Sequence, residues 1–144
     1  MEINLFAEKM MSLYPLIARA ISHHETDHLA QGKITIPQFW TLDYLYTHSS
    51  ATMTEVSQYL KISRAATTGL MDRLLSQGLI MRKRPSGDRR VVRIHITPKG
   101  HGIIKNIRRH KHRSLVEIFS RISAQDRSDY VRILEQVVSI VSHA

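Results

Sequence analysis

The chain has 144 residues, of which 42% are hydrophobic and none is cysteine, and its formal net charge is +9. This length and apolar content suffice for one compact domain, and the absence of cysteine excludes disulfides, thiol redox sensing and cysteine-ligated zinc. No run approaches the roughly 18 apolar residues of a membrane span, and the first residues lack a signal-peptide pattern, so we expect a cytoplasmic protein without membrane contact.

The positive charge is concentrated in one part of the sequence. Residues 61–113 contain 15 of the 21 Lys and Arg but only two of the 12 Asp and Glu, which gives +13 there and −4 for the remainder. Such asymmetry is typical of a surface that binds a polyanion, and nucleic acid is favoured over a membrane because no basic amphipathic anchor accompanies the charge. A basic surface that is merely solvated is the alternative.

Apolar residues at helical spacing predict a first long helix that ends near Gly32. Thr35-Ile-Pro-Gln38 follows, a capping-box pattern that predicts the start of a second helix. We expect this second helix to bury five large side chains: Phe39, Trp40, Leu42, Leu45 and Tyr46.

Two further helices with a tight turn between them are predicted next. A second capping box, Thr52-Met-Thr-Glu55, begins a short helix through Leu60, and Ser63 can cap another helix that ends at Gly78. The face of this fourth helix that is expected to be buried consists of Thr67, Leu70, Met71 and Leu74. Two helices joined this closely predict a helix-turn-helix.

The hydrophobic period then shortens to that of strands. Residues 79–84 and 91–96 are predicted strands with a turn at 85–90, which makes a β-hairpin with a basic tip. Thr97-Pro98 then caps a long helix, and Ser123-Ala-Gln-Asp126 begins the last one. The fold class is therefore mainly α with a small β-hairpin wing, and the terminal helices carry more apolar surface than one small core requires.

A helix-turn-helix followed directly by a basic hairpin is a winged helix-turn-helix, whose second helix enters the major groove of DNA. Arg64 can read guanine through two parallel hydrogen bonds, and Ala65 can pack on a thymine methyl. Gly69 costs about 1 kcal/mol relative to Ala inside a helix, so it is either a place of close approach to DNA or simply tolerated. The predicted recognition-helix site is Ser63, Arg64, Ala65, Thr68, Gly69 and Arg73.

The wing is expected to contact phosphates and the minor groove, which positions the protein on DNA without reading much sequence. Its predicted site residues are Arg82, Arg84, Asp88, Arg89 and Arg90, with Lys83 and Arg93 as further basic contacts. Asp88 is an acid in a basic loop, and its spacing allows it to pair with Arg90 and hold that side chain toward the groove.

The sequence resembles the multiple-antibiotic-resistance regulator (MarR) family over nearly its whole length. The likeness is densest in residues 70–79, LMDRLLSQGL, and residues 88–100, DRRVVRIHITPKG. The resemblance implies a homodimeric transcriptional regulator that binds a pseudo-palindromic site on double-stranded DNA, with Asp88 supporting Arg90 in the minor groove. Such proteins commonly repress, and often a small anionic or phenolic effector between the dimer and DNA-binding parts releases them.

The resemblance also implies a domain organisation. Residues 1–144 would form a single domain, with the winged helix-turn-helix at 35–97 and dimerisation helices at 1–31 and 98–144. We expect no catalytic residues, no metal and no cofactor.

Other interpretations of the sequence stay open. His24-Glu-Thr-Asp-His28 matches the zinc-hydrolase pattern H-E-x-x-H, in which Glu25 would be the general base, but no third ligand is evident. A zinc-responsive regulator could instead use these histidines with His23, or use His101, His110 and His112. A winged-helix protein that binds DNA in an architectural role, without gene-specific regulation, is the remaining alternative.

Overall fold

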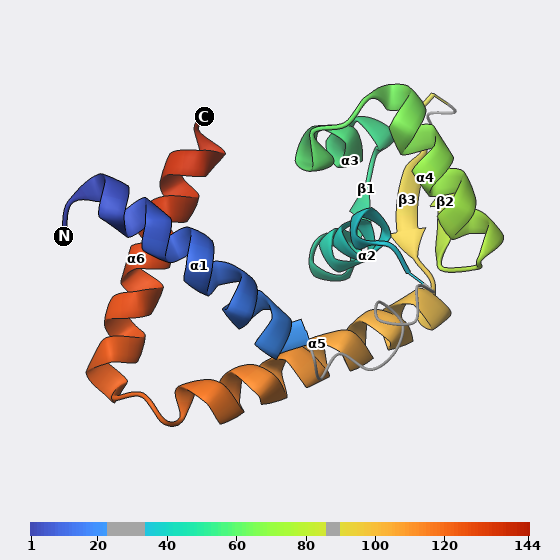
Figure 1. Cartoon of the computed structure of the whole chain (residues 1–144). Coiled ribbons are helices and arrows are strands. Elements are labelled where there is room, and N and C mark those ends of the chain that lie inside the picture. Colours follow the sequence, from blue (N-terminus) through green and yellow to red (C-terminus); the bar gives the residue numbers. More distant parts are fainter. Residues whose placement is uncertain (23–33, 86–89) are drawn as a thin grey trace. The chain divides into compact units, whose positions relative to one another are not determined.

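Figure 1 shows the computed structural model of the protein, which describes residues 1–22, 34–85 and 90–144. The chain is mainly helical with one small antiparallel sheet. It divides into two compact units: Met1–His24 with Lys111–Ala144, called here the terminal unit, and Glu25–His110, called the winged unit. In the described parts of the chain, no helix is long and apolar enough to cross a membrane.

The start of helix α2 (Ile36–His48) is fixed by the predicted capping box. The Thr35 hydroxyl accepts the Gln38 N–H at 3.3 Å, and the Gln38 side-chain oxygen accepts the Thr35 N–H at 3.0 Å. Two N–H groups that have no partner within the helix are thereby satisfied, which confirms the predicted helix start.

One face of α2 packs into the core of the winged unit. Its buried residues are Gln38, Phe39, Thr41, Leu42 and Leu45. Tyr46 packs against them while partly exposed. The expectation that Trp40 is buried is wrong, because its side chain is 49% exposed. Successive residues are about 100° apart around a helix, which places position 40 opposite the buried face.

Helices α3 (Met53–Leu60) and α4 (Arg64–Ser76) form the predicted helix-turn-helix. The Thr52 hydroxyl accepts the Glu55 N–H at 3.1 Å, and Glu55 Oε2 accepts the Thr52 N–H at 3.0 Å, so the second capping box is confirmed.

The turn between the two helices has its own fixed geometry. Lys61 ends α3 in the left-handed conformation with φ 54°, and Ser63 then caps α4 by accepting the Ala66 N–H at 3.1 Å. The predicted inward face of α4 is buried in full: Thr67, Leu70, Met71 and Leu74.

The sheet has three strands, β1 (Ser50–Ala51), β2 (Ile80–Lys83) and β3 (Arg93–Ile96), with β3 in the middle. The hairpin of β2 and β3 pairs residues 80–83 with residues 93–96 and confirms the predicted wing, with shorter strands than expected. Strand β1 was not predicted from the sequence, because two residues are too few to show a period-2 pattern. It places the segment before α3 against β3.

Helix α5 (Pro98–Phe119) begins in close contact with the sheet. The Thr97 hydroxyl accepts the Gly100 N–H at 3.1 Å, which confirms the predicted cap. A Cβ at Gly100 would overlap the carbonyl oxygen of Leu79 and lie 2.9 Å from Cγ1 of Ile96. Only glycine allows the backbone of α5 to approach the sheet so closely.

The first part of α5 belongs to the winged unit. Ile104 and Ile107 are buried in its core. Arg108 forms an ion pair with Asp43 of α2 at 2.6 Å, and its guanidinium lies over the Tyr46 ring at 5.1 Å from the centroid. The division between the two compact units therefore falls inside α5, between residues 110 and 111, and the start of the dimerisation helices at residue 98 stays a prediction.

The terminal unit consists of α1 (Ile3–Ser22), the second part of α5 and α6 (Ala124–Ser142). Ser123 caps α6 as predicted, because its hydroxyl accepts the Asp126 N–H at 3.1 Å. Arg127 closes the turn before α6 by donating to the carbonyl oxygens of Phe119 and Ile122. Helix α6 has no buried residue, and every residue of α1 up to Ala20 is exposed.

Candidate nucleic-acid interface

The outer face of α4 brings the predicted recognition residues together on the surface of the winged unit. Because the opposite face of this helix is buried in the core, the outward side chains are held on a rigid element. The exposed residues include Ser63, Arg64, Ala65, Thr68, Gly69, Asp72 and Arg73.

Arg64 is oriented by a contact that the sequence pattern does not identify. Its Nη2 donates to the hydroxyl oxygen of Thr54 in α3 at 3.3 Å. The guanidinium carries five N–H donors, so one bond to Thr54 is compatible with a bidentate pair to a base. The two residues are ten positions apart across the turn, which is why no local motif indicated Thr54.

The two hydroxyl groups of this face have different capacities. Ser63 accepts the Ala66 N–H, which leaves its own proton for an outside acceptor such as a phosphate oxygen. Thr68 donates its proton to the carbonyl oxygen of Arg64 at 3.0 Å. Thr68 can therefore accept a hydrogen bond from a base amino group or offer its methyl group, but in this rotamer it cannot donate to a phosphate.

Gly69 lies on the same exposed face. A Cβ built there meets no atom of the protein within 4 Å. The protein itself would accommodate a side chain at this position, so any requirement for glycine has to come from an outside partner.

The wing is tied to the recognition helix by an ion pair. Arg82 Nη2 in β2 lies 3.2 Å from Oδ1 of Asp72, on the exposed face of α4. Both side chains are about half exposed, so the pair contributes little to stability but fixes the direction of the Arg82 side chain. Asp72 also lowers the positive charge of this surface locally.

The tip of the wing is described only in part. Arg84 and Arg90 are exposed on either side of it. Asp88 and Arg89 lie outside the described residues, so the pairing of Asp88 with Arg90 stays a prediction.

His95 in β3 is affected by the positive charge of the wing. Partial burial lowers the pKa of its imidazole, and the positive charges of Lys83 and Arg93 lower the pKa further. Nearby cations disfavour the protonated ring, as expected where the local potential is positive. The wing strands are therefore electropositive as predicted from the sequence.

The histidines considered as zinc ligands do not form a metal site in the part of the chain that the structure describes. No group of three or more His, Asp or Glu side chains suited to a metal ion occurs among those residues. His101 instead packs its ring against Tyr46, with centroids 4.7 Å apart. His24, Glu25 and His28 lie outside the described residues.

A capped helix-turn-helix, an exposed α4 and a β-hairpin directly after it define the winged helix-turn-helix class of proteins. Comparison with known proteins makes the assignment narrower. The model of the MarR family matches residues 34–92. The HTH-type transcriptional regulator YsmB of Bacillus subtilis is 32% identical over 127 residues, which are 88% of this chain and 84% of YsmB.

Further relatives are similar to this chain over most of their length. MhqR of Bacillus subtilis, an HTH-type transcriptional regulator, is 25% identical over 90% of this chain and 92% of its own. A MarR family protein from Bacillus stearothermophilus has a solved structure with 28% identity, a TM-score of 0.79 and 99% coverage of both chains. FabT of Streptococcus pneumoniae, solved in complex with DNA, shares the fold at 21% identity, with a TM-score of 0.83 and 99% coverage of both chains.

This chain belongs to the MarR family of transcriptional regulators.

Proposed function

We propose that this regulator binds double-stranded DNA in a sequence-specific manner, with α4 in the major groove and the wing on the flanking backbone and minor groove. The observation that carries the proposal is the exposed face of α4, where Arg64 stands at the helix N-terminus beside Ala65 and Thr68, on a helix whose other face is buried. Bidentate arginine and methyl contacts at such a position are the usual means of reading base edges.

The wing would position the protein rather than read sequence. Arg82, Arg84, Arg89 and Arg90 supply positive charge for phosphates and the minor groove. Asp88 would support Arg90, so Asp88→Ala should weaken DNA binding even though it removes a negative charge. Tighter binding of Asp88→Ala at fixed salt concentration would contradict this role.

The function is tested by selecting duplexes from a randomised double-stranded pool with the full-length protein. Recovery of a palindromic consensus, with half-sites about one helical turn apart, is the expected result. Binding without a consensus would favour the architectural alternative. Affinity for the selected duplex should also fall with salt, with a log-log slope of about −0.9 for each phosphate neutralised.

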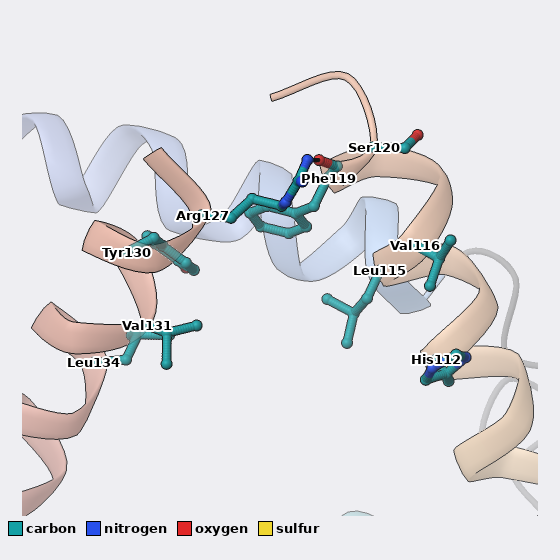
Figure 2. A pocket seen from close by; sticks show the side chains of 9 residues that line it. All are labelled: His112, Leu115, Val116, Phe119, Ser120, Arg127, Tyr130, Val131 and Leu134. Atoms are coloured by element: carbon teal, nitrogen blue, oxygen red, sulfur yellow. Dashed lines mark hydrogen bonds between the residues drawn. The ribbon is translucent and has the colours of Figure 1, made fainter. Parts of the chain in front are cut away.

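We further propose that the terminal unit forms a homodimer interface. Between the second part of α5 and α6 lies an apolar groove of about 670 Å³, whose lining residues are shown in Figure 2. Its main apolar lining residues are Leu115, Val116, Phe119, Tyr130, Val131 and Leu134. Apolar surface of this extent on α1 and α6 favours burial against a second copy. Two copies would present two recognition helices to a palindrome.

A repressor that a small anionic or phenolic effector releases from DNA is the regulatory mode favoured by membership of the family. The test uses 2-hydroxybenzoate, which is both anionic and phenolic, as the probe. Its addition should release the selected duplex and raise the melting temperature of the DNA-free protein. Neither effect at millimolar probe would count against an effector of this chemistry.

A further inference from the structure

Arg93 differs from the other basic residues of the wing in where its side chain is directed. Its Nε donates to the hydroxyl oxygen of Ser50 in β1 at 2.9 Å, and its Nη2 lies 3.9 Å from Oε2 of Glu55 in α3. The side chain is only 33% exposed. From the sequence Arg93 was expected to be one more phosphate contact, whereas its guanidinium here joins β3, the wing strand in the middle of the sheet, to the helix-turn-helix.

Glu55, the acidic partner of Arg93, has a second role. It is the third residue of α3, and the same Oε2 atom accepts the Thr52 N–H at 3.0 Å to close the capping box. The cation of Arg93 therefore lies within 3.9 Å of the carboxylate that holds the first turn of α3.

The first turn of α3 also carries the side chain that orients Arg64. Thr54 stands next to Glu55 in the chain, and its hydroxyl accepts the bond from Arg64 Nη2 at 3.3 Å. One turn of α3 thus contacts the wing through Glu55 and the predicted base-reading residue through Thr54. A shift of this turn would move both contacts together.

We propose that Arg93 is a positioning residue for DNA recognition: it fixes the wing to the first turn of α3, and thereby keeps the phosphate contacts of the wing in register with the base contact of Arg64. The inference rests on the proposed DNA-binding function. It assigns to Glu55, an acid close to the DNA-binding surface, a favourable effect on DNA binding.

Two explanations of the role of Arg93 predict opposite effects of one substitution on DNA affinity. If Arg93 only supplies charge to phosphates, Glu55 competes with DNA for it, and Glu55→Gln should bind DNA more tightly. If Arg93 positions the wing, loss of the carboxylate loosens the link, and Glu55→Gln should bind more weakly.

The substitution Glu55→Gln isolates the ion pair because glutamine is a competent capping-box residue in this same chain. At the start of α2, the Gln38 side chain accepts the Thr35 N–H at 3.0 Å, as Glu55 does for Thr52. The variant should keep α3 capped and the melting temperature close to that of the parent, while losing the charge that holds Arg93.

The experiment measures the Kd of each variant for the duplex that the parent selects from a randomised pool, and for the same duplex with the base pair read by Arg64 replaced. Partly exposed ion pairs are worth up to about fivefold, so we expect Glu55→Gln to bind the selected duplex more weakly by about twofold to fivefold. Its discrimination between the two duplexes should fall as well, a change that a purely structural weakening of the fold would not produce.

Matched variants separate positioning from charge. Arg93→Met and Lys83→Met each remove one cation from directly opposed positions of β3 and β2, and we expect Arg93→Met to have the larger effect on affinity and discrimination. Arg93→Lys keeps the charge but lacks the planar fork, and should restore only part of the affinity. Adding Arg93→Met to Glu55→Gln should cost less than the two single effects combined.

The result that overturns the inference is tighter or unchanged binding by Glu55→Gln, or equal effects of Arg93→Met and Lys83→Met, in a parent that selects a consensus. A parent that shows no preference for any duplex would overturn the proposed function, and the inference with it. The two failures are therefore distinguishable in one set of titrations.

Discussion

The winged unit and the terminal unit differ in how their apolar residues are used. The winged unit has a contiguous core that includes Leu42, Leu45, Met71 and Ile94, each with 0% exposure. In the terminal unit, α6 carries Val131, Leu134 and Val138 at 44–58% exposure and buries none of its residues. Both units contain amphipathic helices, but only the winged unit buries its apolar residues in a core within a single chain.

This difference indicates a division of labour. A core of its own lets the winged unit hold α4 and the wing in fixed geometry, as a surface that reads DNA requires. Helices with unburied apolar stripes are stable mainly through packing against other helices, so in the proposed dimer the terminal unit would depend on an association that the winged unit does not need. Four substitutions test this contrast between the two units.

The core of the winged unit should respond strongly to truncation. Leu42→Ala removes a fully buried side chain and should lower the free energy of unfolding by about 2–5 kcal/mol in denaturant titrations. Ile36→Ala, on the same helix at 57% exposure, is the control and should change it by about 0.5 kcal/mol or less. Equal effects of the two variants would mean that the core of the winged unit is not packed as described.

The proposed dimer interface of the terminal unit should be disrupted by an added charge. Leu134→Asp places a carboxylate in the apolar groove, so we expect a monomer in analytical ultracentrifugation. Loss of the paired half-sites should weaken binding to the palindrome by about 100-fold or more. Gln136→Asp adds the same charge two residues away, on the other side of the exposed helix α6, and should leave a dimer. A dimeric Leu134→Asp protein would refute the proposed interface.

A substitution on the exposed face of α4 should change DNA recognition without changing the stability of the protein. Arg64→Ala should cost about 1–3 kcal/mol on the selected duplex and relax the preference at one base pair of each half-site. Lys105→Ala, which removes the same charge from an exposed position of α5, should leave that preference intact. If Arg64→Ala weakens all duplexes equally, Arg64 contacts phosphate and not a base.

The smallest effect concerns pH and the wing sheet. Because the pKa of His95 is lowered in the folded protein, the unfolded chain takes up a proton more readily than the folded one as the pH falls below 6.5. The stability contributed by neutral His95 is therefore present above that pH and is lost progressively below it. His95→Gln should flatten the dependence of unfolding free energy on pH below about 6.5, and an unchanged slope there would argue against this effect.

The sequence predicted the parts of the fold that depend on residues close together in the chain. The capping boxes at Thr35 and Thr52 and the caps at Ser63 and Ser123 each join residues three apart, so a short pattern contains the whole interaction. The buried face of α4 was predicted for the same reason, because helical periodicity is a local property.

The parts that were not predicted depend on partners far apart in the chain. Strand β1 exists because it pairs with β3, more than 40 residues later, and its two residues carry no pattern of their own. Arg82 and Arg93 were assigned to phosphates from their charge alone, and their contacts with Asp72 and Glu55 depend on tertiary structure. The residues of the candidate site were thus named from the sequence, but the contacts of Arg64, Arg82 and Arg93 with other elements were not.

The close approach of α5 to the sheet has a consequence for how this protein can vary. At Gly100 even a methyl group would overlap the Leu79 carbonyl oxygen, whereas a Cβ at Gly102, two residues further along the same helix, meets nothing within 4 Å. A saturation library should therefore lose almost every allele at position 100 and keep most at position 102. Two glycines of one helix would therefore differ sharply in the number of substitutions that each tolerates.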